Sequence, residues 1–461
     1  MSDRAIRTIA VAGGGIVGLS AALAFARSLP RTTVTLIETP PDPAAIAERI
    51  PVTWPTVHRF HSLIGIDERD LIGNGIATHH VGTVLEAPRG NWVHAFAPHG
   101  SPAGAVHFDQ VWVRAQREGS ARTYDSYSAG AALARANKFA QPPGNSDRRF
   151  DYGLRLDPHL YRNLLREQAA GAKANIVTGV VEEVEREPDG RVSSIRLSTG
   201  DRIEADLFID STGPAGRLIS EVDDSFEPWS GHPMPHLCIN EVETGELATA
   251  ARIAFLDGGW AGEWPLRGRS LRCIARRDPD GPNAIAIRPG SRARPWVYNV
   301  LALGEAAAAF DPLHGLNLDL AQRAILLAID LLPGRDCNPL ELAEYNRRFA
   351  LMADQVRDFL ALHYQALQGI ADVPESLARR IDQYGYRGRL PFQEDEILNR
   401  DDWTAALIGL GFVPCNVDPA AAGVPLDRAT DAMDRMAVEF DSATARLPDY
   451  ADFLERLGSG R

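Results

Sequence analysis

The residues with the clearest chemical meaning are the glycines of a turn near the N-terminus. Gly13, Gly15 and Gly18 have the GxGxxG spacing and follow the apolar run of residues 8–12, which predicts a buried β-strand. In such a turn the first glycine lets the chain bend tightly, and the second lets the backbone approach a pyrophosphate. The third lets the next helix, predicted from Leu19 to about Leu29, pack closely on the strand.

The start of that helix adds hydrogen-bond donors and a positive dipole end at the same place. Free N–H groups there, including those of Ile16 and Val17, would face the phosphates. A second strand, residues 33–37, ends at Glu38, at about the distance where an acidic residue binds ribose hydroxyls. A purely structural Gly-rich turn is the alternative. Because strand, glycines, helix, strand and acid follow in register, the sequence predicts a dinucleotide site.

Composition narrows the class of protein. The 461 residues predict two or three structural units, and 45% hydrophobic residues predict a well-buried interior. With 61 acidic and 48 basic residues, the net charge of −13 argues against nucleic acid or an anionic membrane as a partner. No apolar run has membrane-spanning length and no signal segment is recognisable, so we expect a cytoplasmic protein. Widely spaced cysteines predict free thiols and no metal site: Cys238, Cys273, Cys337 and Cys415.

Patterns in the middle of the chain predict several further elements. Residues 117–149 are rich in small and polar types, which predicts a long loop or lid. Residues 160–170 have helical periodicity. Two alternating runs, 174–186 and 191–197, are joined by Pro188-Asp189-Gly190, which predicts a β-hairpin.

Three later segments favour a flavin over a nicotinamide. The turn at Asp210 and Gly213 resembles the D-x-x-x-x-A-T-G turn of FAD-dependent monooxygenases. The segment with Gly304 and Glu305 resembles their G-D-A sequence, whose acid reaches the flavin ribityl chain; the glutamate is one methylene longer. The third segment opens a helix whose N-terminus can meet the flavin ring, through Pro312, Gly315, Leu316 and Asn317. Their order along the chain predicts FAD.

The resemblance extends to one family, the flavin-dependent tryptophan halogenases. These enzymes have E-P-L-E-S-T before Q-R-A-I, then E-Y-N-R and I-R-D-F-I-x-L-H-Y. The chain is similar to them in residues 311–325, 344–347 and 356–364. Residues 54–56 and 63–68 resemble their T-V-P-T and L-G-I-x-E segments, and residues 206–213 resemble D-L-F-I-D-x-S-G. The similarity spans roughly residues 6 to 370.

This resemblance implies an α/β fold with three parts. Residues 1–80, 150–220 and 290–335 would form a discontinuous, Rossmann-like FAD-binding module. Residues 81–149 and 221–289 would form a substrate module with a mixed sheet, and residues 336–461 a helical C-terminal region, as the helical periodicity from Leu318 onward also indicates. The family also implies an aromatic substrate and, because no second GxGxxG is visible, a separate flavin reductase.

Departures from the family concern the catalytic positions. In the family, hypochlorous acid formed at the flavin reaches a lysine, and a glutamate assists halogenation. Here His80 falls at the lysine position and His314 at the glutamate position. The chloride-binding turn becomes Gly315-Leu316-Asn317, as in aromatic hydroxylases, and W-x-W-x-I-P keeps only its first Trp and its Pro in residues 260–265.

An imidazole cannot form a long-lived chloramine, and a histidine at position 314 would titrate near neutrality. We therefore expect oxygenation of an aromatic or indole-like substrate rather than chlorination, with His80 or His314 as the acid/base. A halogenase with an altered histidine relay is one alternative. A flavin-binding protein without oxygen chemistry is the other.

The remaining candidates have simpler alternatives. His79 and His80 can be a hydrogen-bonded loop pair, and the two with His314 lack metal-ligand spacing. His79, Trp92, Trp260 and Trp264 are predicted to line the substrate pocket, although tryptophans are most often core residues.

Overall fold

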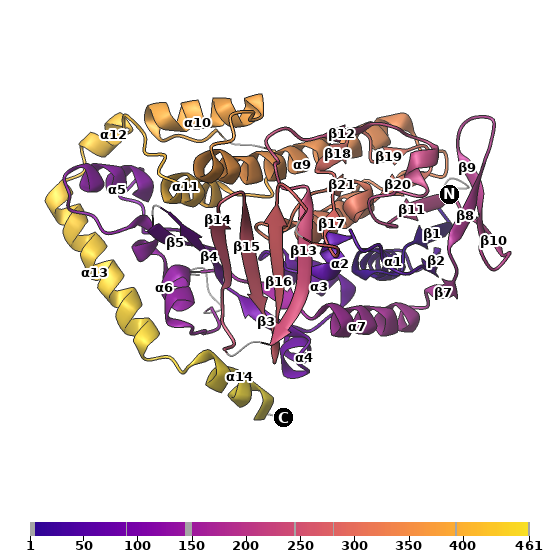
Figure 1. Ribbon diagram of the computed structural model, residues 1–461, viewed down its shortest axis with the longest axis horizontal. Helices are drawn as coiled ribbons and strands as arrows, with labels where there is room; N and C mark the ends of the chain where they lie inside the picture. The colour runs from indigo at the N-terminus through magenta and orange to yellow at the C-terminus, as the bar shows by residue number, and fades with distance from the viewer. Residues whose placement is uncertain are drawn as a thin grey trace.

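A mostly parallel sheet with the strand order β19-β20-β11-β1-β2-β7 forms one end of the molecule (Figure 1). The computed structural model describes residues 5–88, 90–142, 150–243, 246–279, 281–391 and 394–459. Strand β1 lies centrally and is almost wholly buried, as expected for an apolar run in a sheet that helices cover. The strands are β1 (Thr8–Ala12), β2 (Thr33–Glu38), β7 (Asn175–Thr178), β11 (Leu207–Asp210), β19 (Trp296–Val297) and β20 (Val300–Ala302).

Helices pack on this sheet and on each other. Helix α1 (Ile16–Ser28) contacts both α7 (Pro158–Gly171) and α8 (Leu316–Asp330). The predicted helices after the Gly-rich turn and at residues 160–170 are thus confirmed. The predicted hairpin is also confirmed, because β8 (Val181–Arg186) pairs antiparallel with β9 (Val192–Leu197); β10 (Arg202–Glu204) then extends this small sheet.

A second, mixed sheet has the order β17-β13-β16-β15-β14-β4-β5 and lies beside the first (Figure 1). Only the β14–β4 pair is parallel among its described pairs. The sheet therefore joins strands from both segments that the resemblance assigned to the substrate module. Its strands are β4 (Gly82–Ala87), β5 (Gly90–Ala95), β13 (His236–Glu243), β14 (Ala251–Leu256), β15 (Gly259–Pro265), β16 (Arg269–Arg276) and β17 (Ile285–Ala286).

The prediction of a long loop over residues 117–149 is wrong for much of that range. Helix α5 (Phe108–Arg117) is followed by a short 3₁₀ helix, η1 (Tyr124–Tyr127), and by α6 (Ala129–Ala136). The Ser128 hydroxyl caps α6 by accepting from the Ala131 N–H at 3.4 Å. Small alanines bury α6 against β4 and β5, so its core-facing side lacks the large apolar residues that reveal a helix. Residues 143–149 of the predicted loop lie outside the described residues.

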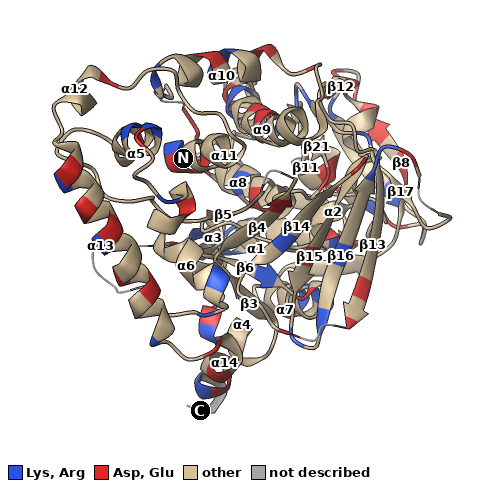
Figure 2. Cartoon of the chain, turned by 60° about the vertical axis from the view of Figure 1, so that its left-hand side comes forward, with Lys and Arg blue, Asp and Glu red and all other residues tan. Residues whose placement is uncertain are grey.

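The C-terminal region is helical, as predicted. Helix α13 runs along one side of the molecule, and acidic residues with fewer basic ones are spread along it (Figure 2), as on a solvated surface. Within the described residues, no helix combines the length and apolar character needed to cross a membrane. The helices are α9 (Pro339–Gln368), α10 (Glu375–Arg387), α11 (Arg400–Gly409), α12 (Pro419–Ala422), α13 (Leu426–Ala445) and α14 (Tyr450–Ser459).

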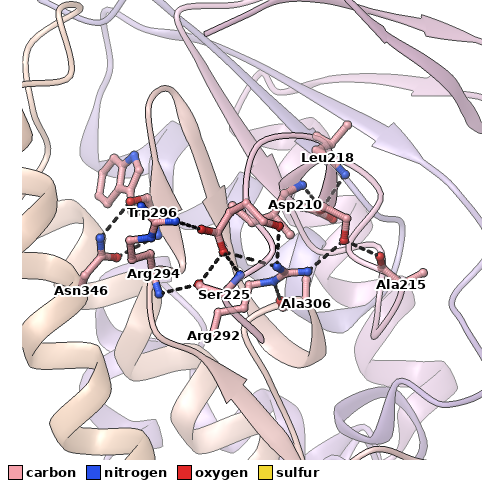
Figure 3. Close-up of polar contacts among 12 residues, drawn as sticks. Asp210, Ala215, Leu218, Ser225, Arg292, Arg294, Trp296, Ala306 and Asn346 are labelled. Carbon is pink, nitrogen blue, oxygen red and sulfur yellow. Dashed lines mark hydrogen bonds and ion pairs between the residues drawn. The ribbon is translucent and has the colours of Figure 1, made fainter. Parts of the chain in front are cut away.

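A buried arginine ties together the segments that surround the first sheet (Figure 3). Arg292 donates to the Ala306 carbonyl at 2.9 Å, the Asp223 carbonyl at 3.0 Å and the Ser220 hydroxyl at 2.9 Å. Its guanidinium also lies 3.6 Å from the buried carboxylate of Asp223. Burial lowers the pKa of Arg292, and the Asp223 carboxylate opposes that shift.

Replacement of Arg292 by methionine should lower the free energy of unfolding by about 3–5 kcal/mol, because it leaves two carbonyls without their donor and removes the buried cation beside the Asp223 carboxylate. Urea denaturation measures the change. Arg294 contacts the same Asp223 at 2.7 Å, but its side chain is 59% exposed. Arg294→Met is the matched control and should cost less than about 1 kcal/mol. Equal losses in both variants would contradict the assignment.

Candidate functional site

The turn after β1 has the backbone geometry of a phosphate cradle. Gly13 has φ +129°, a value that favours glycine, and its N–H donates to the Ile37 carbonyl at 3.0 Å. Gly15 is the N-cap of α1. A Cβ at Gly18 would overlap the Gly13 carbonyl, so the helix can approach the strand only with glycine there. The predicted roles of Gly13 and Gly18 match the local geometry, while the role of Gly15 and the cofactor contacts stay predictions.

An unpredicted residue, Glu48 of α2 (Ile46–Arg49), occupies this cradle. Its carboxyl accepts a hydrogen bond from the Val17 N–H at 3.2 Å, and a Cβ at Gly15 would overlap its Oε1. Burial raises the pKa of Glu48 to about 8. The sequence offered no signal for it, because its spacing from the glycines matches no dinucleotide motif.

The cradle fits the phosphates of a dinucleotide once Glu48 is displaced. The first-turn N–H groups that bind its carboxyl are donors that an anion needs, and the dipole end favours negative charge. A cavity of about 220 Å³ beside Glu48 is lined by Arg49 and Arg162, among others. These cations can pair with a phosphate or with the displaced carboxylate.

FAD binding should therefore tighten as pH rises. The buried Glu48 holds its proton up to a pKa of about 8, whereas a displaced, solvated carboxyl has the ordinary value of 4.5. Binding then releases a proton between these values, so the affinity should rise by up to about tenfold per pH unit over that window. Fluorescence titration with FAD at several pH values measures this. Glu48→Gln should bind FAD with little pH dependence, and an equal slope in both proteins would refute the displacement.

Three other predicted cofactor residues, Glu38, Asp210 and Glu305, form hydrogen bonds within the segments around the cradle. Glu38 ends β2 and accepts from Arg166 at 2.8 Å. Asp210 accepts from the N–H groups of Leu218 and Ile219 at 2.7 and 2.8 Å, which fixes the turn after β11 (Figure 3). Glu305 accepts from the Ala47 N–H at 2.8 Å, and burial raises its pKa to about 7. Their direct contacts with FAD stay predictions.

Two other predicted cofactor residues in these segments are glycines. Gly213 has φ +90°, and a Cβ there would lie 2.7 Å from Asp42 Cβ. Gly304 has φ +59° and lies beside Val17 of α1.

The N-terminus of α8 is the predicted place of the flavin ring. Gly315 caps the helix with φ +66°, and Pro312, Leu316 and Asn317 are all buried. Asn317 donates to the Phe310 carbonyl at 2.9 Å, while its buried Oδ1 has no hydrogen-bond partner among the described residues. This acceptor suits an N–H of a ligand. A Cβ at Gly315 would lie only 2.7 Å from Val52, so a flavin ring would have to share this helix end with residues 52–54.

Four buried histidines from four segments meet next to this helix end. His80 ends β3 (Ala77–His80), His94 lies in β5, His314 precedes α8 and His363 lies in α9. The rings of His314 and His363 are 4.5 Å apart, and those of His94 and His314 are 5.4 Å apart. His80 lies against Phe96 at 5.2 Å. We call these four residues the histidine cluster.

Hydrogen bonds fix the protons of this cluster. His363 Nδ1 lies 2.8 Å from the Phe359 carbonyl, so Nδ1 donates and Nε2 of the neutral ring accepts. His314 Nε2 lies 3.0 Å from that nitrogen and must therefore donate to it, which leaves the lone pair of His314 on Nδ1.

The cluster is neutral at physiological pH. Burial lowers the pKa of His94 to about 4 and that of His363 to about 3. Burial, with the neighbouring imidazoles, holds the pKa of His314 well below its ordinary value, and burial with Arg155 does the same for His80. The expectation that His314 titrates near neutrality is therefore wrong, because the sequence does not reveal this burial.

Trp54 packs against the histidine cluster on the side of α8. Its indole N–H donates to the His314 carbonyl at 3.0 Å, and its ring packs on Phe96 at 4.7 Å and on His94 at 5.7 Å. Trp54 and His363 lie in segments that carry the family resemblance, which is the signal that could have singled them out. His94 carries no such signal.

His79 points away from the cluster because side chains alternate along a strand. Its Nδ1 lies 3.0 Å from the Tyr450 hydroxyl, its Nε2 lies 3.5 Å from Glu68, and its ring stacks on Phe139 at 3.8 Å. The described residues contain no group of three metal-ligating side chains, and all four cysteines are free.

The predicted pocket tryptophans separate into two groups. Trp260 donates to the Tyr364 hydroxyl at 3.0 Å and lies edge-on to Trp264, and both are buried in the core. Trp92 instead lines a cavity of about 380 Å³. Neither His80 nor His314 lines this cavity, the cavity of about 220 Å³ beside Glu48 or a cavity of about 300 Å³ beside Trp54, and His79, Trp260 and Trp264 do not line these described cavities either.

Comparison with known proteins identifies a family. The family model described as tryptophan halogenase matches residues 8–275 and 270–426. Tryptophan 7-halogenase RebH from Lentzea aerocolonigenes is 26% identical over 62% of this chain and 64% of its own length, which is less than two thirds. Tryptophan 7-halogenase KtzQ from Kutzneria sp. (strain 744) is 23% identical over 100% of both chains.

Solved structures show the same fold. A flavin-dependent halogenase from Brevundimonas sp. BAL3 has a TM-score of 0.91 and 26% identity, covering 98% of this chain and 99% of that one. A flavin-dependent halogenase from Xanthomonas campestris has the same TM-score and coverage, with 28% identity. The predicted α/β fold is therefore confirmed, and this chain belongs to the tryptophan halogenase family.

Proposed function

We propose that this chain is a flavin-dependent halogenase that acts on an aromatic substrate and receives reduced FAD from a separate reductase. One observation carries the proposal: nearly the whole chain superposes, at a TM-score of 0.91, on two proteins described as flavin-dependent halogenases. These comparisons do not support the expected preference for oxygenation. They favour the alternative, a halogenase with an altered histidine relay.

The chain's own residues would divide the work. Reduced FAD bound to this chain would supply, with O₂, the oxidising power for the halide. The glycine cradle and the first turn of α1 would bind the phosphates, and Asn317 Oδ1 would accept from the ligand at the end of α8. The buried aromatic rings around the cluster exclude water.

His314 is the proposed proton acceptor. A neutral imidazole can take the proton that an aromatic carbon releases after halogenation, and the available lone pair is the one on Nδ1. His363 fixes this tautomer by accepting from Nε2. His80 replaces the family's lysine with an uncharged ring, so its proposed role is to orient a small oxidant by hydrogen bonding.

A flavin-binding protein without oxygen chemistry is the second candidate. One structural feature favours it: His80 and His314, at the positions of the family's catalytic lysine and glutamate, are buried and uncharged.

Aerobic turnover separates the candidates. The purified protein is supplied with FAD, a flavin reductase and indole, with chloride, bromide or neither, and products are read by mass spectrometry. We expect a bromide- or chloride-dependent gain of one halogen. A halide-independent gain of one oxygen would overturn the proposal, and bound FAD with no product would favour the second candidate. Gly15→Val is the matched cofactor-free control.

A further inference from the structure

A cavity lined by aromatic rings lies beside the histidine cluster. It has a volume of about 380 Å³, within the range of small-molecule sites. His99 stacks on Tyr124 with ring centres 4.5 Å apart and planes 10° apart, and Trp112 packs edge-on to Tyr124 at 5.2 Å. Trp92 forms another wall. Flat faces at these positions suit an aromatic ligand.

Three elements that line part of the cavity also carry or contact members of the cluster. On β5, Trp92 and His94 are two residues apart and point to the same side of the strand. On α9, Leu367 lines the cavity one turn after His363. On α11, residues 405 and 408–409 line the cavity, while the Asp402 carbonyl accepts from His94 Nε2 at 3.2 Å. The cavity is therefore a neighbour of the cluster.

The Trp92 side chain in the cavity wall has a buried hydrogen-bond donor without an acceptor among the described residues. Trp92 Nε1 has no hydrogen-bond partner among the described residues, and the residue is only 9% exposed. Gly409 lies against this edge of the indole, and a Cβ at that residue would overlap Nε1. The glycine keeps a side chain away from this buried N–H, and an unpaired buried donor is costly unless a ligand accepts from it.

The charges at the cavity are already neutralised. Among the described lining residues only Asp125 and Arg122 are charged. Asp125 accepts from the Val93 N–H at 2.9 Å and forms an ion pair with Arg135, while Arg122 pairs with Asp434. Burial lowers the pKa of His99 to about 3, so that ring is neutral. A zwitterion such as free tryptophan would bring two charges without partners.

We infer that this cavity binds an uncharged aromatic molecule with a hydrogen-bond acceptor that receives the Trp92 N–H. That the cavity is the site of the aromatic substrate rests on the proposed function. It names the substrate class as a neutral arene and not a free amino acid.

Calorimetric binding measurements test the site without flavin or halide. Indole-3-carboxamide has the acceptor, 3-methylindole lacks it, and tryptophan and indole-3-carboxylate are charged. We expect the carboxamide to bind at least about tenfold more tightly than either charged probe. Trp92→Phe should weaken carboxamide binding by about tenfold, the scale of one hydrogen bond, and leave 3-methylindole within about twofold.

Gly409→Ala supplies a second variant, because a methyl group at that residue would overlap Nε1 and shift the indole N–H from its present position. It should reproduce the selective loss for the carboxamide. Gly171→Ala, which lies outside the cavity lining, should leave binding of both neutral probes unchanged. Equal binding of the charged probes, or equal effects of Trp92→Phe on both neutral probes, would overturn the site. If the probes bind as expected but none is halogenated, the proposed function fails and the site stands.

Discussion

Replacement of Gly15 by valine is expected to abolish FAD binding, with a rise of more than about 100-fold in Kd. Gly15 has φ −86° and ψ −178°, which any residue adopts, so the substitution adds bulk without straining the backbone. That bulk falls where Glu48 now lies and where a pyrophosphate would bind. The loss should therefore be specific to the ligand.

FAD fluorescence titration measures this effect, and thermal unfolding of the ligand-free variant checks the fold. Gly171→Ala is a suitable control, because a Cβ at residue 171 would meet no atom within 4 Å. This variant should bind FAD as the wild type does. Full flavin occupancy in Gly15→Val would show that the dinucleotide does not use the glycine cradle.

The second large effect is expected at His314. His314→Ala should lower kcat for the halogenated product by about 100-fold, the scale of losing a general acid/base, with FAD affinity unchanged. His363→Gln should cost less, because its amide oxygen can still accept from His314 Nε2. A His314→Ala variant with more than half of the wild-type kcat would exclude the proposed role.

The pH profile gives an independent check on the same residue. Burial holds the pKa values of His314 and His363 well below 6.5. These histidines are neutral from pH 6 to 9 and should not add an ionisation to the kcat profile in that range. A step in kcat near pH 6.5 that disappears in His314→Ala would contradict the neutral cluster.

The expected displacement of Glu48 determines the pH at which these tests should be made. Because its carboxyl takes the N–H donors that phosphates need, affinity measured at low pH understates the capacity of the cradle. Flavin occupancy should therefore be measured above pH 8 before an inactive preparation is interpreted as a protein without oxygen chemistry.

The sequence by itself determined the local elements and the family. Strand β1, the glycine turn, α1 and Glu38 follow from spacing within forty residues, and the hairpin follows from Pro188-Asp189-Gly190. Such features depend on backbone conformation and side-chain periodicity, which neighbouring residues set. The family motifs indicated the tryptophan halogenases, which the comparisons confirmed. The preference for oxygenation, drawn from His80, His314 and the turn at residues 315–317, found no such support.

Only the tertiary structure decided what surrounds the predicted residues. Glu48 reaches Val17 across 31 positions, His314 meets His363 across 49, and His94 donates to the Asp402 carbonyl across 308. No local pattern encodes these distances. The burial that keeps the histidines neutral and the cavity beside Trp92 also arise where β5, α9 and α11 pack together. Chemistry at this site depends on that packing, because burial sets the charge of each side chain and neighbours set its proton.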